Sequence, residues 1–433
     1  MELYSTNKKS PNVNLKTAIF QGLPEDNGLF IPTAIPSMSK SFFNNIQQLS
    51  FQDIAFEVSK TLLSGEVNES SLLEIIKDAF DFNTPVIKLS DQQHVLELWH
   101  GPTCAFKDYG ARFMSRLMGN FLINDRKEIT ILVATSGDTG GAVGYGFLNV
   151  EGIQVKILYP KGKVSEIQEK QLTTIGNNVT AIEIDGNFDD CQFLVKSAFL
   201  DKQISNKLNL TSANSINIAR LIPQSFYYFH AYAQLKHNGR PLVCSVPSGN
   251  FGNLSGGLLA YKMGLPVEKF IAATNVNDIV PNYLKTGVFK PKPSKETISN
   301  AMDVGNPSNF PRILAILDQD EKVVRNLIQG YAFDDKATRQ AIKQVYGDYQ
   351  YLMCPHTAVA YLGLKEFMHQ HDNKNYCGLI LSTAHPAKFR DVVSQVIQKD
   401  VPLPEGLTQA YNKNSQVMKL SNKFEALKSY LMG

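Results

Sequence analysis

The feature of this sequence that most constrains its fold is a series of short apolar runs, each followed by a turn and a helical stretch. The first set is His94–Leu98, Ile129–Ala134, Val155–Leu158 and Val179–Ile184, and the second is Pro241–Val246, Phe270–Thr274 and Gly378–Ser382. Strands of a parallel sheet have this pattern because helices cover both faces of the sheet. The sequence therefore predicts an α/β protein with parallel sheets, whose ligands bind at the carboxyl ends of the strands.

A stretch without a strand pattern, roughly residues 195–235, lies between the two sets of runs. It predicts that the runs form two separate sheets. The first 90 or so residues predict loops and helices, among them a helix over Leu72–Phe80 with Ser70 and Ser71 as its cap. We therefore expect an N-terminal extension followed by two α/β domains.

The composition excludes several classes of protein. With 43% hydrophobic and 19% charged residues, the chain is globular and not disordered. The 43 basic and 40 acidic residues leave a net charge of +3, which does not favour nucleic acid as a partner. No run of ~18 apolar residues is present to span a membrane, and the N-terminus does not resemble a signal peptide. The five cysteines include no CxxC pair, so neither a metal site nor a disulfide framework is indicated, and we expect a cytoplasmic protein.

Two loops have the strand–glycine–helix form that binds anions. The first is Thr135–Gly141, before a helix expected from about Ala142, and the second is Pro247–Asn253, before a helix expected from about Leu254. Glycine lets a ligand approach the backbone, and the free N–H groups of a helix N-terminus suit a phosphate or carboxylate. One such loop is equally typical of an ordinary turn, whereas two favour a site for two anionic groups. Neither loop has the spacing of a dinucleotide-binding or Walker A motif, which disfavours those ligands.

Lys107 follows the apolar residues Ala105 and Phe106, just before a helix expected from about Asp108. A lysine at this position is an ordinary surface charge if it is exposed. If it is partly buried, it loses proton affinity and becomes a nucleophilic amine, as a Schiff-base lysine needs.

A third strand-to-helix loop contains Thr383 and His385. The pattern favours His385 as an ordinary turn-capping residue. Thr383 fits a helix N-cap equally well as a side chain that points into a site.

Taken together, these segments resemble the threonine synthase family of pyridoxal-phosphate enzymes, which has the tryptophan-synthase-β-like fold. The matching segments, in chain order, are Gly22–Pro32, Leu96–Asp108, Ala134–Gly140, Val246–Leu254, Ala272–Asp278 and Ser382–Pro386. The resemblance implies pyridoxal-phosphate fold type II, with two α/β domains that contain parallel sheets and an N-terminal domain over residues 1–90. The catalytic region would cover 91–433, with a smaller subdomain at about 115–210 inserted between the parts 91–114 and 211–433 of a larger cofactor domain.

The resemblance also implies a role for individual residues. Lys107 matches the catalytic lysine that carries pyridoxal 5'-phosphate, and Thr383 matches the hydroxyl residue that faces the pyridine nitrogen. A neutral hydroxyl leaves this nitrogen unprotonated and makes the ring a milder electron sink, which suits elimination chemistry. The residues expected around the cofactor phosphate are Ser248, Gly249, Asn250, Phe251, Gly252 and Asn253. Those expected around the substrate are Ser136, Gly137, Asp138 and Thr139 for its carboxylate, and Asn214, Ser215 and Arg220 for its phosphate.

The activity that the resemblance implies is the conversion of O-phospho-L-homoserine and water to L-threonine and phosphate, with Lys107 as the proton shuttle. We expect a monomer or homodimer. Two alternatives remain open. A serine/threonine dehydratase would share the lysine and the glycine loop but would not need the Asn214–Arg220 segment, and a non-catalytic relative would bind the cofactor or a phosphorylated ligand as a sensor.

Three residues depart from the family pattern. Cys104 stands where a larger aliphatic residue is frequent. We expect the cysteines to be structural, although Cys104 lies close enough to Lys107 to be an inhibitor target. Gly141 and Gly144 replace alanines in the helix after Asp138, and each is expected to destabilise that helix by about 0.5–1 kcal/mol.

Overall fold

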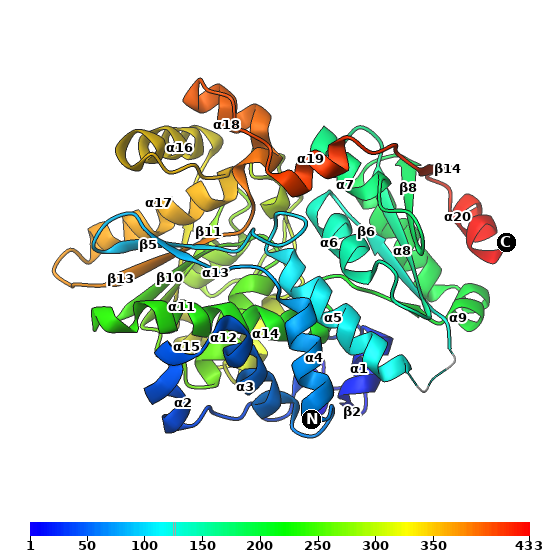
Figure 1. Cartoon of the computed structure of the whole chain (residues 1–433), viewed down its shortest axis with the longest axis horizontal. Helices are drawn as coiled ribbons and strands as arrows, with labels where there is room; N and C mark the ends of the chain where they lie inside the picture. Colours follow the sequence, from blue (N-terminus) through cyan, green and yellow to red (C-terminus); the bar gives the residue numbers. More distant parts are fainter. Residues whose placement is uncertain (124, 126) are drawn as a thin grey trace.

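The computed structural model describes residues 1–123, 125 and 127–433. Figure 1 shows two sheets side by side, each packed against helices. In the larger sheet, five strands are parallel and the last, at one edge, is antiparallel. Its six strands are, in spatial order, β12 (Ile328–Ala332), β11 (Lys269–Thr274), β10 (Leu242–Pro247), β13 (Cys377–Ser382), β5 (Gln93–Glu97) and β4 (Val86–Lys88).

The smaller sheet is entirely parallel. Its five strands are, in spatial order, β14 (Val417–Ser421), β8 (Val179–Asp185), β7 (Ile153–Pro160), β6 (Ile129–Ala134) and β9 (Leu210–Thr211). Two parallel sheets with helical connections confirm the predicted α/β class.

The seven strands predicted from the sequence are all present, within two residues of their expected bounds. One of them lies in an unexpected place, because β5 pairs with β13 in the larger sheet and not with the other strands of the first set. Strands β4, β9, β12 and β14 were not predicted. All four lie at sheet edges, and β14 is partly exposed along its whole length, so it lacks a continuous apolar run.

Helices cover both faces of the larger sheet. On one face lies α17 (Pro355–Gln370), with α16 (Asp335–Tyr349) packed behind it, and on the other lie α11 (Phe226–Leu235) and α12 (Gly252–Lys262). Consecutive residues of β10 point to opposite faces: Val243 joins the core on the α17 side and Cys244 the core on the α12 side. This double burial explains why the central strands have continuous apolar sequences.

The smaller sheet is covered in the same way. On one face lie α8 (Phe188–Leu200) and α20 (Phe424–Met432), and on the other lie α5 (Lys107–Leu122) and α6 (Asp138–Phe147). The expected domain assignment placed every residue after 211 in the larger domain. The C-terminal segment differs from this expectation, because β14 pairs with β8 and α20 packs against α8.

The N-terminal region contains a three-stranded antiparallel sheet, formed by β2 (Val13–Asn14), β1 (Glu2–Ser5) and β3 (Phe30–Pro32). The expectation of only loops and helices there was therefore wrong, since strands this short leave little pattern in a sequence. The predicted helix is α4, and its cap is Asn68, whose side chain accepts the N–H of Ser71. The helices of this region are α1 (Leu15–Gln21), α2 (Lys40–Asn45), α3 (Phe51–Leu63) and α4 (Glu69–Ala79).

The remaining α-helices and one 3-10 helix lie in the segments that connect the strands. They are α7 (Glu166–Thr173), α9 (Lys202–Leu208), α10 (Ile218–Leu221), α13 (Ile279–Thr286), α14 (Phe310–Ile316), α15 (Glu321–Leu327), the short 3-10 helix η5 (Pro386–Phe389), α18 (Arg390–Ile397) and α19 (Glu405–Tyr411). Among the described residues, none of the helices has both the length and the apolar character needed to cross a bilayer.

Candidate active site

Lys107 is the first residue of α5, in the segment that follows β5. This segment is attached to the carboxyl end of β13. The N–H of Phe106 donates to the carbonyl of Thr383 at 2.8 Å, and Ala105 pairs with Ala384 in an isolated bridge. The structure therefore brings the lysine loop and the third loop together, although they are far apart in the sequence, and the side chain of Thr383 is buried there.

The side chain of Lys107 is only 18% exposed, and its Nζ lies 3.8 Å from Oδ2 of Asp138. Desolvation lowers the pKa of Lys107, and the nearby positive charges of Lys388 and Arg220 lower it further, while Asp138 acts in the opposite direction. A lysine with a lowered pKa has more of its amine uncharged near neutral pH, which is the form that attacks a carbonyl.

The carboxylate of Asp138, the first residue of α6, is engaged by protein groups. Its Oδ1 forms an ion pair with Nζ of Lys388 at 2.7 Å and accepts a hydrogen bond from Nε2 of Gln168 at 2.9 Å. Although burial acts in the opposite direction, these partners hold its pKa well below the usual range, so the carboxylate is charged. The side chain that the sequence placed against a substrate carboxylate thus faces two lysines instead.

The rest of the first glycine loop is fixed by Thr135, whose hydroxyl oxygen accepts the N–H groups of Gly137 and Gly140. Gly137 has φ +135°, and a Cβ there would lie 2.5 Å from Cδ of Gln168. Of the other expected substrate contacts, Ser136 is exposed and Thr139 is half-buried. Their side chains therefore remain accessible at the N-terminus of α6.

The second glycine loop forms the start of α12, with Gly252 as its first residue. Phe251 has φ +61°, and a Cβ on Gly249 would lie 2.6 Å from the backbone of Met302, so this loop is closely packed. The N–H of the buried Ser248 donates to the carbonyl of Ala273 at 2.8 Å. Oδ1 of Asn253 accepts from the hydroxyls of Tyr227 and Tyr228, each at 2.8 Å, whereas its Nδ2 is buried without a partner.

An unpartnered buried donor at a helix N-terminus is costly unless a ligand accepts from it. Nδ2 of Asn253 is such a donor, and the glycines of this loop let a ligand approach the backbone closely. Together they fit an anionic group such as a phosphate. The residues present therefore suit the cofactor that the sequence implies.

The Asn214–Arg220 segment contacts this loop directly. Nδ2 of Asn250 donates to Oγ of Ser215 at 2.7 Å, while Oδ1 of Asn250 accepts the N–H of Ser308. Asn214 is half-buried at the start of the same segment. The two groups of residues that the sequence assigned to two different phosphates thus lie next to each other.

Arg220 is buried, and its guanidinium packs against α5 one turn after Lys107, where a Cβ on Gly110 would lie 2.7 Å from its Nε. One nitrogen, Nη1, donates to the carbonyl of Ala213, but Nε is buried without a partner. Desolvation lowers the pKa of Arg220 to about 10, so it is still charged at neutral pH. An incompletely paired guanidinium near Lys107 is suited to an anionic substrate group.

Two residues near Lys107 were missed by the sequence reasoning. Lys388 in η5 is fully buried, although nothing in its local sequence except the apolar neighbours Ala387 and Phe389 signals this. His356, near the start of α17, is buried within reach of the charges of Asp138 and Lys107, and its Nε2 accepts the N–H of Ala301 at 3.2 Å. Burial lowers the pKa of His356 to about 4, so it is neutral.

His385 caps the turn of η5, since its Nδ1 accepts the N–H of Ala387 at 3.1 Å, which confirms the turn-capping interpretation. The five cysteines are free and buried thiols. Burial raises the pKa of Cys104 to about 11, so its thiol is protonated and weakly nucleophilic near neutral pH. This burial agrees with the structural role expected of the cysteines and disfavours Cys104 as an inhibitor target.

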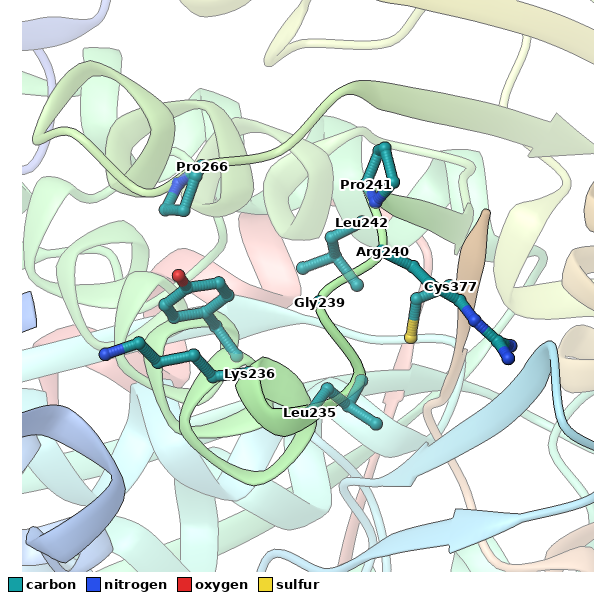
Figure 2. Close-up of a pocket in the computed structure, with 9 residues that line it drawn as sticks. Leu235, Lys236, Gly239, Arg240, Pro241, Leu242, Pro266 and Cys377 are labelled. Carbon is teal, nitrogen blue, oxygen red and sulfur yellow. The ribbon is translucent and has the colours of Figure 1, made fainter. Parts of the chain in front are cut away.

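A cavity of about 320 Å³ opens at the end of the larger sheet where its parallel strands begin, opposite the end that holds Lys107 (Figure 2). It lies beside Leu242 and Cys377, where β10 and β13 begin, and Lys236 and Arg240 also line it. In parallel sheets the ligand site lies where strands end, so this cavity is separate from the site around Lys107.

Comparison with known proteins was made at three levels. A family model described as pyridoxal-phosphate dependent enzyme matches residues 79–382, and models described as threonine synthase N terminus and threonine synthase, C-terminal match 2–80 and 357–431. The threonine synthase of Buchnera aphidicola is 42% identical over 435 residues, which cover 100% of both chains.

Two solved structures are similar over the whole chain. The crystal structure of threonine synthase from Escherichia coli has a TM-score of 0.92 and 41% identity, and the match covers 100% of this chain and 99% of that one. A pyridoxal-phosphate-bound threonine synthase from Brucella melitensis has a TM-score of 0.93 and 32% identity, covering 100% and 98%.

Proposed function

The chain belongs to the threonine synthase family of pyridoxal-phosphate-dependent enzymes, and from this premise we propose that Lys107 carries the cofactor and moves the protons of the reaction. The enzyme is a lyase that converts O-phospho-L-homoserine and water to L-threonine and phosphate. The observation that supports the assignment of Lys107 is its largely buried amine, which lies at the carboxyl ends of the strands with its pKa lowered by desolvation.

Pyridoxal 5'-phosphate supplies an electron sink that stabilises negative charge on carbon next to the substrate nitrogen. We assign its phosphate to the loop at the start of α12, because the buried Nδ2 of Asn253 lacks a protein partner. Lys107 would hold its aldehyde carbon, and Thr383 would face its ring nitrogen with a neutral hydroxyl. The phosphate loop consists of Ser248, Gly249, Asn250, Phe251, Gly252 and Asn253.

Lys107 then acts as the base and acid of the reaction. Its amine removes a proton from the α-carbon of the substrate, gives that proton up, and then removes another from the β-carbon, after which phosphate leaves from the γ-carbon. Water adds at the β-carbon, and Lys107 returns protons to the γ- and α-carbons. A single amine can serve in both directions when its pKa lies near the working pH, which the desolvation of Lys107 favours.

We assign the substrate phosphate to Arg220 with Asn214 and Ser215. The unpartnered Nε of Arg220 and its charge suit the growing negative charge on the leaving group. We assign the substrate carboxylate to Ser136, Gly137 and Thr139, and to the backbone N–H of Asp138 at the N-terminus of α6.

The two alternative functions are disfavoured. A serine/threonine dehydratase does not need a phosphate segment, yet Arg220 lies near Lys107. A non-catalytic sensor has no need for a lysine with a lowered pKa beside the ligand loop. If no pyruvate or other ketoacid is found among the reaction products, the dehydratase function is excluded. If the protein turns over its substrate at all, the sensor function is excluded.

We further propose a smaller domain at about 115–210 between the parts 91–114 and 211–416 of a larger one, with 417–433 added to the smaller. The pairing of β14 with β8 supports the assignment of residues 417–433 to the smaller domain.

We also propose that the protein is a monomer or homodimer without a nucleic-acid partner. We propose that it works in the cytoplasm, since five free thiols suit a reducing compartment. Analytical ultracentrifugation and cell fractionation test these two points.

The proposed assignment of Lys107 is tested by adding O-phospho-L-homoserine to the cofactor-loaded protein and quantifying threonine and phosphate. The natural chain is expected to form threonine and phosphate in equal amounts. Lys163→Ala, which changes an exposed lysine and serves as the control, is expected to do the same. Lys107→Ala is expected to fold, as judged by circular dichroism, and to form no threonine. Threonine formation by a folded Lys107→Ala protein would refute the assignment.

A further inference from the structure

Two lysines share one buried carboxylate at the centre of the site. Lys388 lies 2.7 Å from Oδ1 of Asp138, and Lys107 lies 3.8 Å from its Oδ2. The side chain of Lys388 is 0% exposed, and that of Asp138 is 5% exposed. The shorter of two ion pairs is the stronger one in a buried setting, so Lys388 is the principal partner of Asp138.

Lys388 is also held at a second point, since its Nζ donates to the carbonyl of Thr103 at 2.9 Å. Neighbouring side chains complete the network: Gln171 donates to the same carbonyl at 3.2 Å, and Gln168 donates to Oδ1 of Asp138. A buried ammonium that donates to one carbonyl and pairs with one carboxylate is fixed in place, because leaving either partner would cost that interaction with no water to replace it.

The charges that face Lys107 come from four different elements. Asp138 on α6 is negative, Lys388 on η5 and Arg220 on α10 are positive, and His356 on α17 is neutral. On the segment of Lys107 itself, Asp108 accepts two hydrogen bonds from Thr103, and burial raises its pKa to about 6. Burial also keeps the thiol of Cys104 protonated. Asp138 is thus the group that favours a charged Lys107, and Lys388 opposes it.

We propose that Lys388 is a positioning residue, which binds the carboxylate of Asp138 and so leaves the amine of Lys107 uncharged and free to react with the cofactor. This inference rests on the proposed role of Lys107 as the attachment point. In attachment, the Lys107 nitrogen forms a C=N bond to the aldehyde carbon, and the aldehyde oxygen leaves as water with the two amine protons. A protonated amine has no free electron pair for this step. Without Lys388, Asp138 would pair with Lys107 and keep it protonated.

The test measures how fast the cofactor-free protein takes up pyridoxal 5'-phosphate at different pH values, followed by the visible absorbance of the C=N bond. Lys388→Met removes the charge and retains much of the side-chain volume. We call the pH at which attachment reaches half of its maximum rate the midpoint. Lys388→Met is expected to slow attachment at neutral pH by about tenfold, which corresponds to a rise of about one pH unit in this midpoint. Asp138→Asn is expected to lower the midpoint, and the double variant is expected to return it towards that of the natural chain.

The opposite directions of the two single variants are the decisive feature. A merely structural role for Lys388 would slow attachment equally at every pH, and it would not be reversed by Asp138→Asn. Lys388→Arg, which keeps the charge, is expected to retain most of the natural midpoint, and the exposed control Lys163→Met is expected to leave it unchanged. An unchanged midpoint in folded Lys388→Met overturns the proposal. If that variant does not fold, a midpoint in Asp138→Asn that fails to fall overturns it equally.

The same assay separates this proposal from the proposed function. Lys107→Ala is expected to abolish the absorbance of the C=N bond. If the absorbance persists in Lys107→Ala, the attachment point itself is wrong. If the absorbance depends on Lys107 but the Lys388 and Asp138 variants do not shift its midpoint in opposite directions, only the role of Lys388 is refuted.

Discussion

Replacement by alanine is expected to have opposite effects on stability at two glycines of α6, Gly141 and Gly144. Both stand inside the helix that follows the first glycine loop. A Cβ at Gly141 would lie 3.7 Å from Cβ of Gln171, which is an ordinary van der Waals contact. A Cβ at Gly144 would lie 2.4 Å from Cδ1 of Ile175 and 3.2 Å from Cδ1 of Ile157.

The magnitudes follow from two effects. Replacing glycine with alanine in a helix interior stabilises it by about 0.5–1 kcal/mol, and this gain is common to both positions. Overpacking at Gly144 opposes the gain by about 1–3 kcal/mol, because Ile175 and Ile157 must move. Gly141→Ala is therefore expected to stabilise the protein by up to about 1 kcal/mol, whereas Gly144→Ala is expected to destabilise it by up to about 2 kcal/mol.

The helix gain cancels in the difference between the two variants, which isolates the packing effect of about 1–3 kcal/mol. Urea unfolding of the cofactor-free proteins, monitored by circular dichroism, gives this difference from the transition midpoints when the slopes are equal. If both variants shift the midpoint in the same direction by the same amount, the packing argument is refuted. If Gly141→Ala destabilises the protein, the interpretation of Gly141 as a weak point of the helix is wrong.

Two further predictions concern the site. Arg220→Ala is expected to weaken binding of O-phospho-L-homoserine by about tenfold or more, since a charge-assisted hydrogen bond contributes about 1.5–3 kcal/mol. The inhibition constant of an unphosphorylated homoserine analogue is expected to change little. Equal losses for both ligands would remove Arg220 from the phosphate site. Cys104 is expected to resist alkylation by iodoacetamide at pH 8, because a thiol with a pKa of about 11 is protonated there, and to react faster only as the pH approaches that value. Peptide mass spectrometry measures the labelled fraction, and rapid labelling of the folded protein at pH 8 would contradict the burial of this thiol.

Local sequence was sufficient to predict the central strands but not the edges. The strands β6, β10 and β13 are buried at every position, so each is a continuous apolar run. At an edge the physical demand is weaker: β14 is partly exposed throughout and contains Lys419, so its sequence resembles a loop. Its pairing with β8 depends on a partner more than 200 residues away in the chain, which no local pattern can indicate.

The same distinction applies to the site. The positions of Lys107, Gly249 and Asp138 follow from local rules, since glycine-containing turns and helix N-termini are properties of a few consecutive residues. The partners of their side chains are not local. Lys388 and Asp138 are 250 residues apart, and they meet only because η5 follows β13 in one sheet and α6 follows β6 in the other.

This separation explains why Asp138 was assigned to the substrate. Its place at the start of α6 is typical of a residue that contacts an anion, but a carboxylate there repels an anionic ligand unless a cation neutralises it. Lys388 provides that cation from η5, which follows a strand of the larger sheet, and the backbone N–H groups of α6 would then be free to bind a substrate carboxylate. In the proposed function, the carboxylate of Asp138 would therefore act on the two lysines, and its backbone N–H would bind the substrate. If so, Asp138→Asn should alter the pH dependence of cofactor attachment more than the affinity for substrate.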